Sequence, residues 1–147
     1  VGIEAVSFNL SHSADVAALA ISRDTRVGVD VEDIREIRSD EIERALSIAE
    51  RLELAEAADA LQLETFFRFW TLKEAFMKGT GLGASLPLHD FDVSPAGPGL
   101  LRLKSAPTEP GRWRFDEFVP KPGIRAALAA RTDDRDLVVQ WRWADFE

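Results

Sequence analysis

The chain has 147 residues, of which 46% are hydrophobic and 30% are charged, as is typical of a globular protein. A chain of this length can bury a sizeable core, so we expect one domain over residues 1–147. The net charge of −8 argues against a nucleic-acid partner, and the sequence has neither an apolar run long enough to cross a bilayer nor a signal peptide at its start. There is no cysteine, which excludes disulfides and thiolate metal sites. We therefore expect a cytoplasmic protein that does not bind membranes.

The first third of the chain predicts short strands. Apolar and polar residues alternate over residues 6–11, a pattern typical of a strand with one buried face. A compact apolar run follows at residues 15–22. Alternation resumes at residues 26–32, where three valines share one face and Asp30 and Glu32 share the other. The turns between these segments are short, which favours antiparallel pairing.

Helices are predicted next. Ser39 can cap a first helix whose opening turn is acidic, but Ile42 stands where a capping box needs Glu or Gln. A second helix is predicted at about residues 47–61, and a third runs from about residue 64 to Lys78 and ends at the glycines of GTGLG. Strand-like segments resume at residues 91–94, 100–103, 113–118, 124–130 and 137–143. This order predicts an α+β fold in which antiparallel strands pack against a few helices.

Asp30 and Glu32 form the first candidate site. Residues two apart on a strand point to the same side, about 7 Å from each other. Two such carboxylates offer the oxygen ligands that magnesium prefers. On this pair alone, however, an exposed polar face of an edge strand is the better interpretation.

Two other candidates are equally open when taken singly. His12, in a Ser-His-Ser stretch, could bind phosphate as a cation, but turn chemistry accounts for it more simply. Glu74 and Lys78 are four residues apart on the third predicted helix and could form a surface ion pair worth about 0.3–0.5 kcal/mol. The aromatic residues around this pair argue against a fully solvated helix face. We assign Trp70 and its aromatic neighbours to packing.

The order of three motifs changes this assessment. FNLSHS at 8–13, GVDVE at 28–32 and FWTLKEAFMKGTGLG at 69–83 together resemble the 4′-phosphopantetheinyl transferase superfamily. The resemblance is to the surfactin-synthetase-activating type, whose hallmarks are an N-x-S-H-S turn, a G-[IV]-D-[IVL]-E strand and a W-x-x-K-E-A-x-x-K helix. All three are present here without a mismatch.

The resemblance implies an enzyme that moves the phosphopantetheine arm of coenzyme A onto a serine of an acyl or peptidyl carrier protein. It implies that Asp30, Glu32 and Glu74 are magnesium ligands. Glu74, or a metal-bound water, would accept the serine proton, and Lys78 would hold the pyrophosphate.

Further residues are assigned to coenzyme A by the same resemblance. Ser11 and His12 would bind its phosphates from the turn. Lys73 would add a second phosphate contact.

Relatives of this type consist of two similar halves, and this chain resembles only the second half of such a pseudo-dimer. The other half, from the same chain or another copy, is expected to complete the coenzyme site. The alternative is a non-catalytic structural module that pairs with another subunit. Clustered carboxylates argue against that alternative, because a module relieved of metal binding has no physical reason to keep them.

Overall fold

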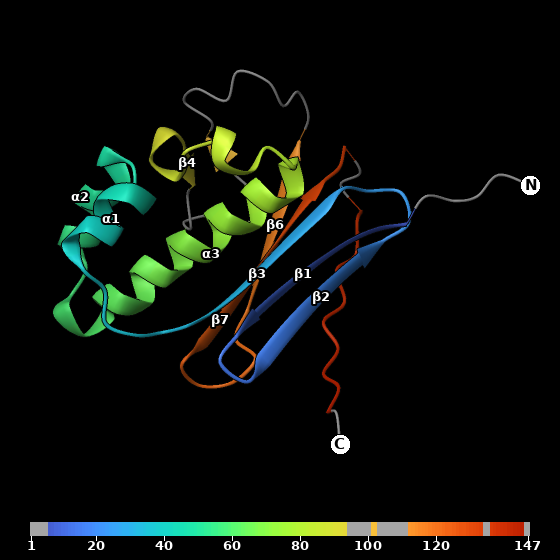
Figure 1. Ribbon diagram of the computed structural model, residues 1–147, viewed down its shortest axis with the longest axis horizontal. Helices are drawn as coiled ribbons and strands as arrows, with labels where there is room; N and C mark the ends of the chain where they lie inside the picture. Colours follow the sequence, from blue (N-terminus) through green and yellow to red (C-terminus); the bar gives the residue numbers. More distant parts are fainter. Residues whose placement is uncertain (1–5, 94–100, 103–111, 134–135, 146–147) are drawn as a thin grey trace, which may run out of the picture.

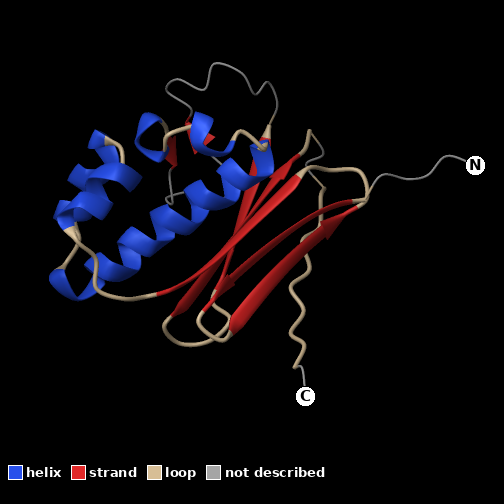
Figure 2. Cartoon of the chain, in the orientation of Figure 1, coloured by secondary structure: helices blue, strands red, loops and turns tan. Residues whose placement is uncertain are grey.

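The structure is a computed structural model that describes residues 6–93, 101–102, 112–133 and 136–145. Its central sheet has three antiparallel strands in the order β3-β7-β6, and helix α3 crosses one face of that sheet (Figure 1). The fold is α+β, as predicted, with the helices gathered on one side (Figure 2). The helices are α1 (Ser39–Ala45), α2 (Ile48–Glu56) and α3 (Gln62–Thr80), with short 3₁₀ turns η1 (Asp59–Leu61), η2 (Gly83–Ser85) and η3 (Leu88–Asp90). The strands are β1 (Ser7–Ser13), β2 (Val16–Ser22), β3 (Val27–Asp33), β4 (Asp92–Val93), β5 (Leu101–Arg102), β6 (Trp113–Phe118) and β7 (Ile124–Arg131).

The β1–β2 hairpin lies along the free edge of β3, but side chains rather than backbone groups join the two. From Asn9 onward, every second residue of β1 presents a side-chain oxygen to a backbone N–H of β3. The contacts are Val29 N to Asn9 Oδ1 at 2.9 Å, Val31 N to Ser11 Oγ at 3.3 Å, and Asp33 N to Ser13 Oγ at 3.0 Å. These bonds satisfy the edge of the sheet, so the FNLSHS motif forms a strand here rather than a turn.

This arrangement reverses the face of β1 that the alternation led us to expect inside. The polar side chains point toward β3, and the apolar ones point outward, with Phe8 71% exposed. The exposed apolar side chains lie opposite one another across the hairpin, Phe8 against Ile21 and Leu10 against Leu19. We call this surface the outer hairpin face; it consists of Val6, Phe8, Leu10, Leu19 and Ile21.

Helix α3 approaches β3 closely because two glycines meet there. A Cβ atom on Gly28 would lie 2.0 Å from the carbonyl oxygen of Ala75 and 2.3 Å from the backbone nitrogen of Gly79. The Gly28 face of β3 therefore lies directly beneath α3. The valines of β3 face the other side of the sheet, where Val31 packs with Ile124.

The helix boundaries differ slightly from those predicted. Arg38, not Ser39, is the N-cap residue of α1, and the Glu41 carboxylate accepts its backbone N–H at 3.0 Å. Helix α2 is shorter than expected and begins with a capping box between Ser47 and Glu50. Helix α3 ends as predicted, at a glycine, because Gly81 adopts the left-handed conformation with φ of 73°.

The later strands were predicted with mixed success. Strands β6 and β7 are confirmed, whereas β4 covers only part of the predicted segment 91–94 and β5 only part of 100–103; Ser94, Leu100 and Leu103 lie outside the described residues. The predicted strand at 137–143 is wrong. That segment instead packs on the sheet, with Trp141 stacked on Phe118 at 4.8 Å between ring centroids. None of the helices described is long and apolar enough to span a bilayer.

Candidate active site

Lys78 of α3 and Asp30 of β3 form the centre of the candidate site. Lys78 Nζ lies 2.7 Å from Asp30 Oδ1 and 3.1 Å from Ser11 Oγ, and the Ser11 hydroxyl donates to the same Asp30 oxygen at 3.1 Å. Three elements that are far apart in sequence thus meet at one carboxylate. The close contact of α3 with β3 makes this possible, because it brings the last turns of the helix over the strand.

Asp30 is buried, with 2% of its surface exposed, so the predicted exposed polar face of an edge strand is wrong. Helix α3 covers this face, and burial raises the pKa of the Asp30 carboxyl although Lys78 opposes the shift. Burial raises the pKa of Glu32 to about 7, and burial also raises that of Glu74. In both glutamates the Asp30 charge adds to the increase. Asp30 therefore lies close enough to each of the two glutamates for its charge to repel theirs in a poorly solvated place.

Trp70 belongs to this cluster, although the sequence led us to assign it to packing. Its indole N–H donates to Glu32 Oε1 at 3.2 Å. Trp70 precedes Glu74 by four residues, so the two side chains occupy the same stripe of α3. The spacing of Trp70, Glu74 and Lys78, four residues apart along α3, could have indicated that Trp70 shares the face of the helix that lies over β3.

The site fits a hard cation in one specific respect. Asp30 Oδ2 is buried and has no hydrogen-bond partner, and such an orphaned oxygen is unusual in a folded protein. Among the residues described, no three acidic or imidazole groups are close enough to enclose a metal ion by themselves. Magnesium seldom needs such a cage, since it takes one or two carboxylates and completes its octahedron with waters and substrate phosphates. The spare oxygen of Asp30, with the Glu32 carboxylate two residues along the same face of β3, therefore offers the kind of donor that magnesium prefers.

Lys73 is not part of the cluster. Its side chain is fully buried, and its ammonium group lies 2.5 Å from Glu50 Oε2 and 2.7 Å from the carbonyl oxygen of Phe91. Glu50 also accepts the backbone N–H of Val93 at 2.7 Å, so this pair joins α2, α3 and the segment leading into β4. A phosphate could reach Lys73 only if these contacts broke. The structure therefore argues against the expected contact between Lys73 and a phosphate of coenzyme A.

His12 is also separated from the cluster. It follows Ser11 on β1, and because successive strand residues point to opposite faces, Ser11 is directed inward while His12 is exposed. The structure thus brings together Ser11, Asp30, Glu32, Glu74 and Lys78 and leaves His12 and Lys73 outside.

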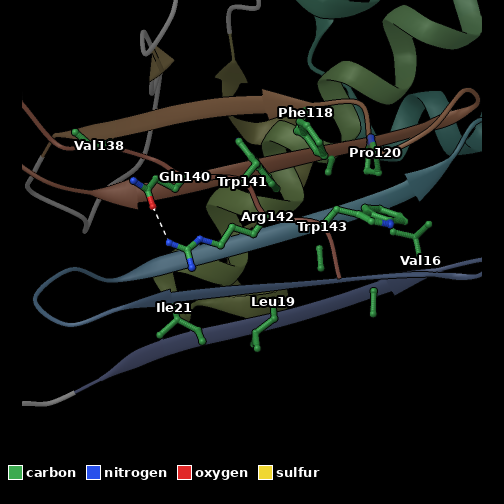
Figure 3. Close-up of a pocket in the computed structure, with 13 residues that line it drawn as sticks. Val16, Leu19, Ile21, Phe118, Pro120, Val138, Gln140, Trp141, Arg142 and Trp143 are labelled. Carbon is green, nitrogen blue, oxygen red and sulfur yellow. Dashed lines mark hydrogen bonds between the residues drawn. The ribbon is translucent and has the colours of Figure 1, made fainter. Parts of the chain in front are cut away.

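A hollow lies on the face of the sheet opposite to α3 (Figure 3). It separates β2 from the C-terminal segment and is lined mainly by apolar side chains, among them Leu19, Ile21, Trp141 and Trp143. Two of these residues, Leu19 and Ile21, also belong to the outer hairpin face. The apolar surface of the hairpin therefore continues into this groove.

Comparison with known proteins is consistent with the motifs. The family model of the 4′-phosphopantetheinyl transferase superfamily matches residues 26–133. The 4′-phosphopantetheinyl transferase HetI of Nostoc sp. is 33% identical over 125 residues, which cover 83% of this chain and 50% of HetI. The 4′-phosphopantetheinyl transferase psf-1 of Bacillus pumilus is 40% identical over 103 residues, 69% of this chain and 44% of that protein. The chain thus spans about half the length of these relatives.

Solved structures show the same fold. The holo-(acyl-carrier-protein) synthase of Bacillus anthracis, solved in complex with CoA (3′,5′-ADP), superposes with a TM-score of 0.61 at 17% identity. The match covers 73% of this chain and 96% of that one. The predicted fold is therefore confirmed.

Proposed function

Because the chain belongs to the 4′-phosphopantetheinyl transferase superfamily, we propose that it forms the catalytic half of an enzyme that modifies carrier proteins. The reaction would transfer the 4′-phosphopantetheine arm of coenzyme A to a serine of an acyl or peptidyl carrier protein. The observation that carries this proposal is the meeting of Lys78, Asp30 and Ser11 beside the orphaned oxygen of Asp30. A cation and a carboxylate with spare coordinating capacity are what a pyrophosphate and its counter-ion require.

Asp30, Glu32 and Glu74 would hold a magnesium ion. When bound, that ion would neutralise charge on the pyrophosphate as it breaks. The raised pKa values of the three carboxyls support this assignment, because a site that repels its own negative charges gains from a divalent cation.

In the transfer step, the serine oxygen of the carrier protein bonds to the phosphorus that bears the pantetheine arm. The bond from that phosphorus to the bridging oxygen breaks, and adenosine 3′,5′-bisphosphate leaves with the electron pair. Glu74 would accept the serine proton, directly or through a water, and burial raises the pKa of its carboxyl, which makes the carboxylate a stronger base. Lys78 stabilises the charge that develops on the leaving pyrophosphate oxygen.

Ser11 and His12 would contact the phosphates of coenzyme A from the two faces of β1. Ser11 already donates to Asp30 and accepts from Lys78, so its hydroxyl lies where a phosphate held by Lys78 would come. His12, exposed on the other face, is available to a phosphate that lies outside the hairpin.

A second half, in the same chain or in another copy, would complete the coenzyme site. The support for this is the outer hairpin face, where five large apolar side chains are more than half exposed. An apolar surface of this kind usually marks an interface. We also infer a cytoplasmic location, with which the absence of cysteine agrees.

Titration calorimetry tests the proposal directly. Coenzyme A is titrated into the protein with and without magnesium, and transfer to a purified apo carrier protein is measured in parallel. We expect tight binding of coenzyme A only with magnesium, and transfer under the same conditions. Binding that is absent or indifferent to magnesium would leave the non-catalytic module as the better interpretation.

A further inference from the structure

The contact between Trp70 and Glu32 has no place in the chemistry above, since indole neither binds magnesium nor accepts a proton. The indole ring is held firmly from one side, because it packs on the buried ring of Phe66 at 5.7 Å between centroids. Packing on Phe66 thus restrains the same ring whose N–H donates to Glu32.

Glu32 needs such an anchor more than Asp30 does. Asp30 is fixed by Lys78 and Ser11, whereas Glu32 has a longer side chain and lies beside a carboxylate that repels it. Without a donor, the Glu32 carboxylate would gain by moving away from Asp30, which also lies on the α3 face of the strand. The hydrogen bond from Trp70 opposes that movement.

The kind of donor also matters. A lysine or arginine in the position of Trp70 would hold Glu32 but would cancel its charge. A neutral indole N–H occupies one carboxylate oxygen and leaves the negative charge for another partner. Lys78 pairs with Asp30, and the attraction of Arg35 is the smallest of the effects on the pKa of Glu32, so the charge of Glu32 is little compensated by a cation.

We propose that Trp70 is a positioning residue that holds Glu32 in place for magnesium, without touching the metal or the substrate. This inference rests on the proposed function, because it assumes that magnesium binds at Asp30 and Glu32. It assigns to Trp70 a role in metal affinity that packing alone would not give.

The chain offers a matched control in Trp113. This tryptophan lies on β6 and packs against α3, with its ring 5.0 Å from that of Phe76, and its indole nitrogen has no hydrogen-bond partner among the residues described. Trp70→Phe and Trp113→Phe therefore remove the same indole atoms, one set from α3 and the other from the strand that packs on it, and only Trp70→Phe removes a hydrogen bond to a carboxylate.

The experiment measures magnesium affinity by calorimetry in the presence of coenzyme A, alongside the magnesium dependence of transfer. Loss of a group that orients a metal ligand typically weakens metal binding by about 10- to 100-fold. We expect a loss of that size in Trp70→Phe, turnover restored at saturating magnesium, and nearly unchanged affinity in Trp113→Phe. In a Glu32→Gln background, Trp70→Phe should add no further loss.

A measurement on the unchanged protein covers the case in which Trp70→Phe does not fold. The indole N–H signal of Trp70, assigned through its contacts with the α3 backbone, should shift when magnesium is added with coenzyme A. The Trp113 signal should stay in place. Equal losses of affinity in both variants, or a Trp70 signal that ignores magnesium, would overturn the inference while leaving the proposed function intact. If the unchanged protein binds no magnesium at all, both the role of Trp70 and the proposed function are contradicted.

Discussion

Lys78 pairs with Asp30, 48 residues away on β3, rather than acting as the surface partner of Glu74 one turn earlier on its own helix. This contact joins α3 to the strand at the point where the two backbones come closest. A surface pair within one helix would tolerate loss of either partner, but loss of Lys78 here would leave Asp30 as a buried carboxylate without its cation.

Lys78→Gln should therefore affect both rate and stability. If Lys78 stabilises the breaking pyrophosphate, its loss should lower turnover by about 10²–10³-fold. Lys78→Arg should restore only part of that rate, because a planar guanidinium does not reproduce a compact ammonium. Steady-state transfer to a purified carrier protein measures both variants, and retention of more than about a third of wild-type turnover by Lys78→Gln would exclude the assigned role.

Asp30→Asn should abolish transfer without unfolding the protein. Burial outweighs Lys78 in its effect on Asp30, so the pKa of the carboxyl is raised and its negative charge is less favourable in the folded protein than in the unfolded chain. Removing the charge should leave the melting temperature without magnesium unchanged or higher at neutral pH. Thermal denaturation with and without magnesium checks this, and magnesium should stabilise only the wild type. A substantial fall in metal-free melting temperature would show that the carboxylate contributes to the fold.

Lys73→Met should destabilise the fold rather than impair phosphate binding. The substitution leaves Glu50 buried without its cation, which typically costs about 3–5 kcal/mol. The double variant Lys73→Met/Glu50→Gln should recover part of this loss, because Gln keeps an acceptor for the Val93 N–H. Denaturant unfolding measures the free energies. A Lys73→Met protein of normal stability with a greatly raised KM for coenzyme A would instead support the assignment of Lys73 to a phosphate contact.

Gly28→Ala should prevent α3 from settling on β3. The new methyl group would overlap backbone atoms of Ala75 and Gly79, and neither can move without displacing the helix. Gly123→Ala is the control, since a Cβ there meets open space and costs only the strain of its positive φ, about 1–2 kcal/mol. Circular dichroism melts should show a much larger loss for Gly28→Ala. Equal losses in the two variants would contradict the close packing.

The isolated chain should self-associate through the outer hairpin face. Phe8→Ser combined with Ile21→Thr removes a cross-strand apolar pair that points away from the core, so the fold should survive while association falls. Sedimentation velocity of both proteins tests this. A monomeric wild-type chain with full transferase activity would show that the face needs no partner.

The sequence motifs indicated the acids and the lysine that the structure brings close together, because the strand and helix periods place Asp30 with Glu32 and Glu74 with Lys78, although the assigned roles stay predictions. They could not predict which face of β1 is buried. Alternation defines two faces, and only the neighbouring strand decides that the polar one turns inward.

Lys73 was misassigned for a similar reason. Its partner Glu50 is 23 residues earlier, on another helix, and no local sequence pattern predicts a contact between the two. Trp70 packs on Phe66, as an aromatic residue within an aromatic helix is expected to do, but its hydrogen bond could not be predicted because that bond depends on how β3 passes beneath it.

Side chains rather than backbone groups join β1 to β3. Amide hydrogen exchange should therefore report movement of the β1–β2 hairpin separately from opening of the sheet. The N–H groups of Val29, Val31 and Asp33 are protected by the rotatable side chains of Asn9, Ser11 and Ser13. A rotamer change in β1 is enough to expose them to water, whereas exposure of the amides between β3 and β7 requires the strands themselves to separate. The two edges of one strand should therefore exchange at different rates, and a ligand that grips Ser11 would slow only one of them.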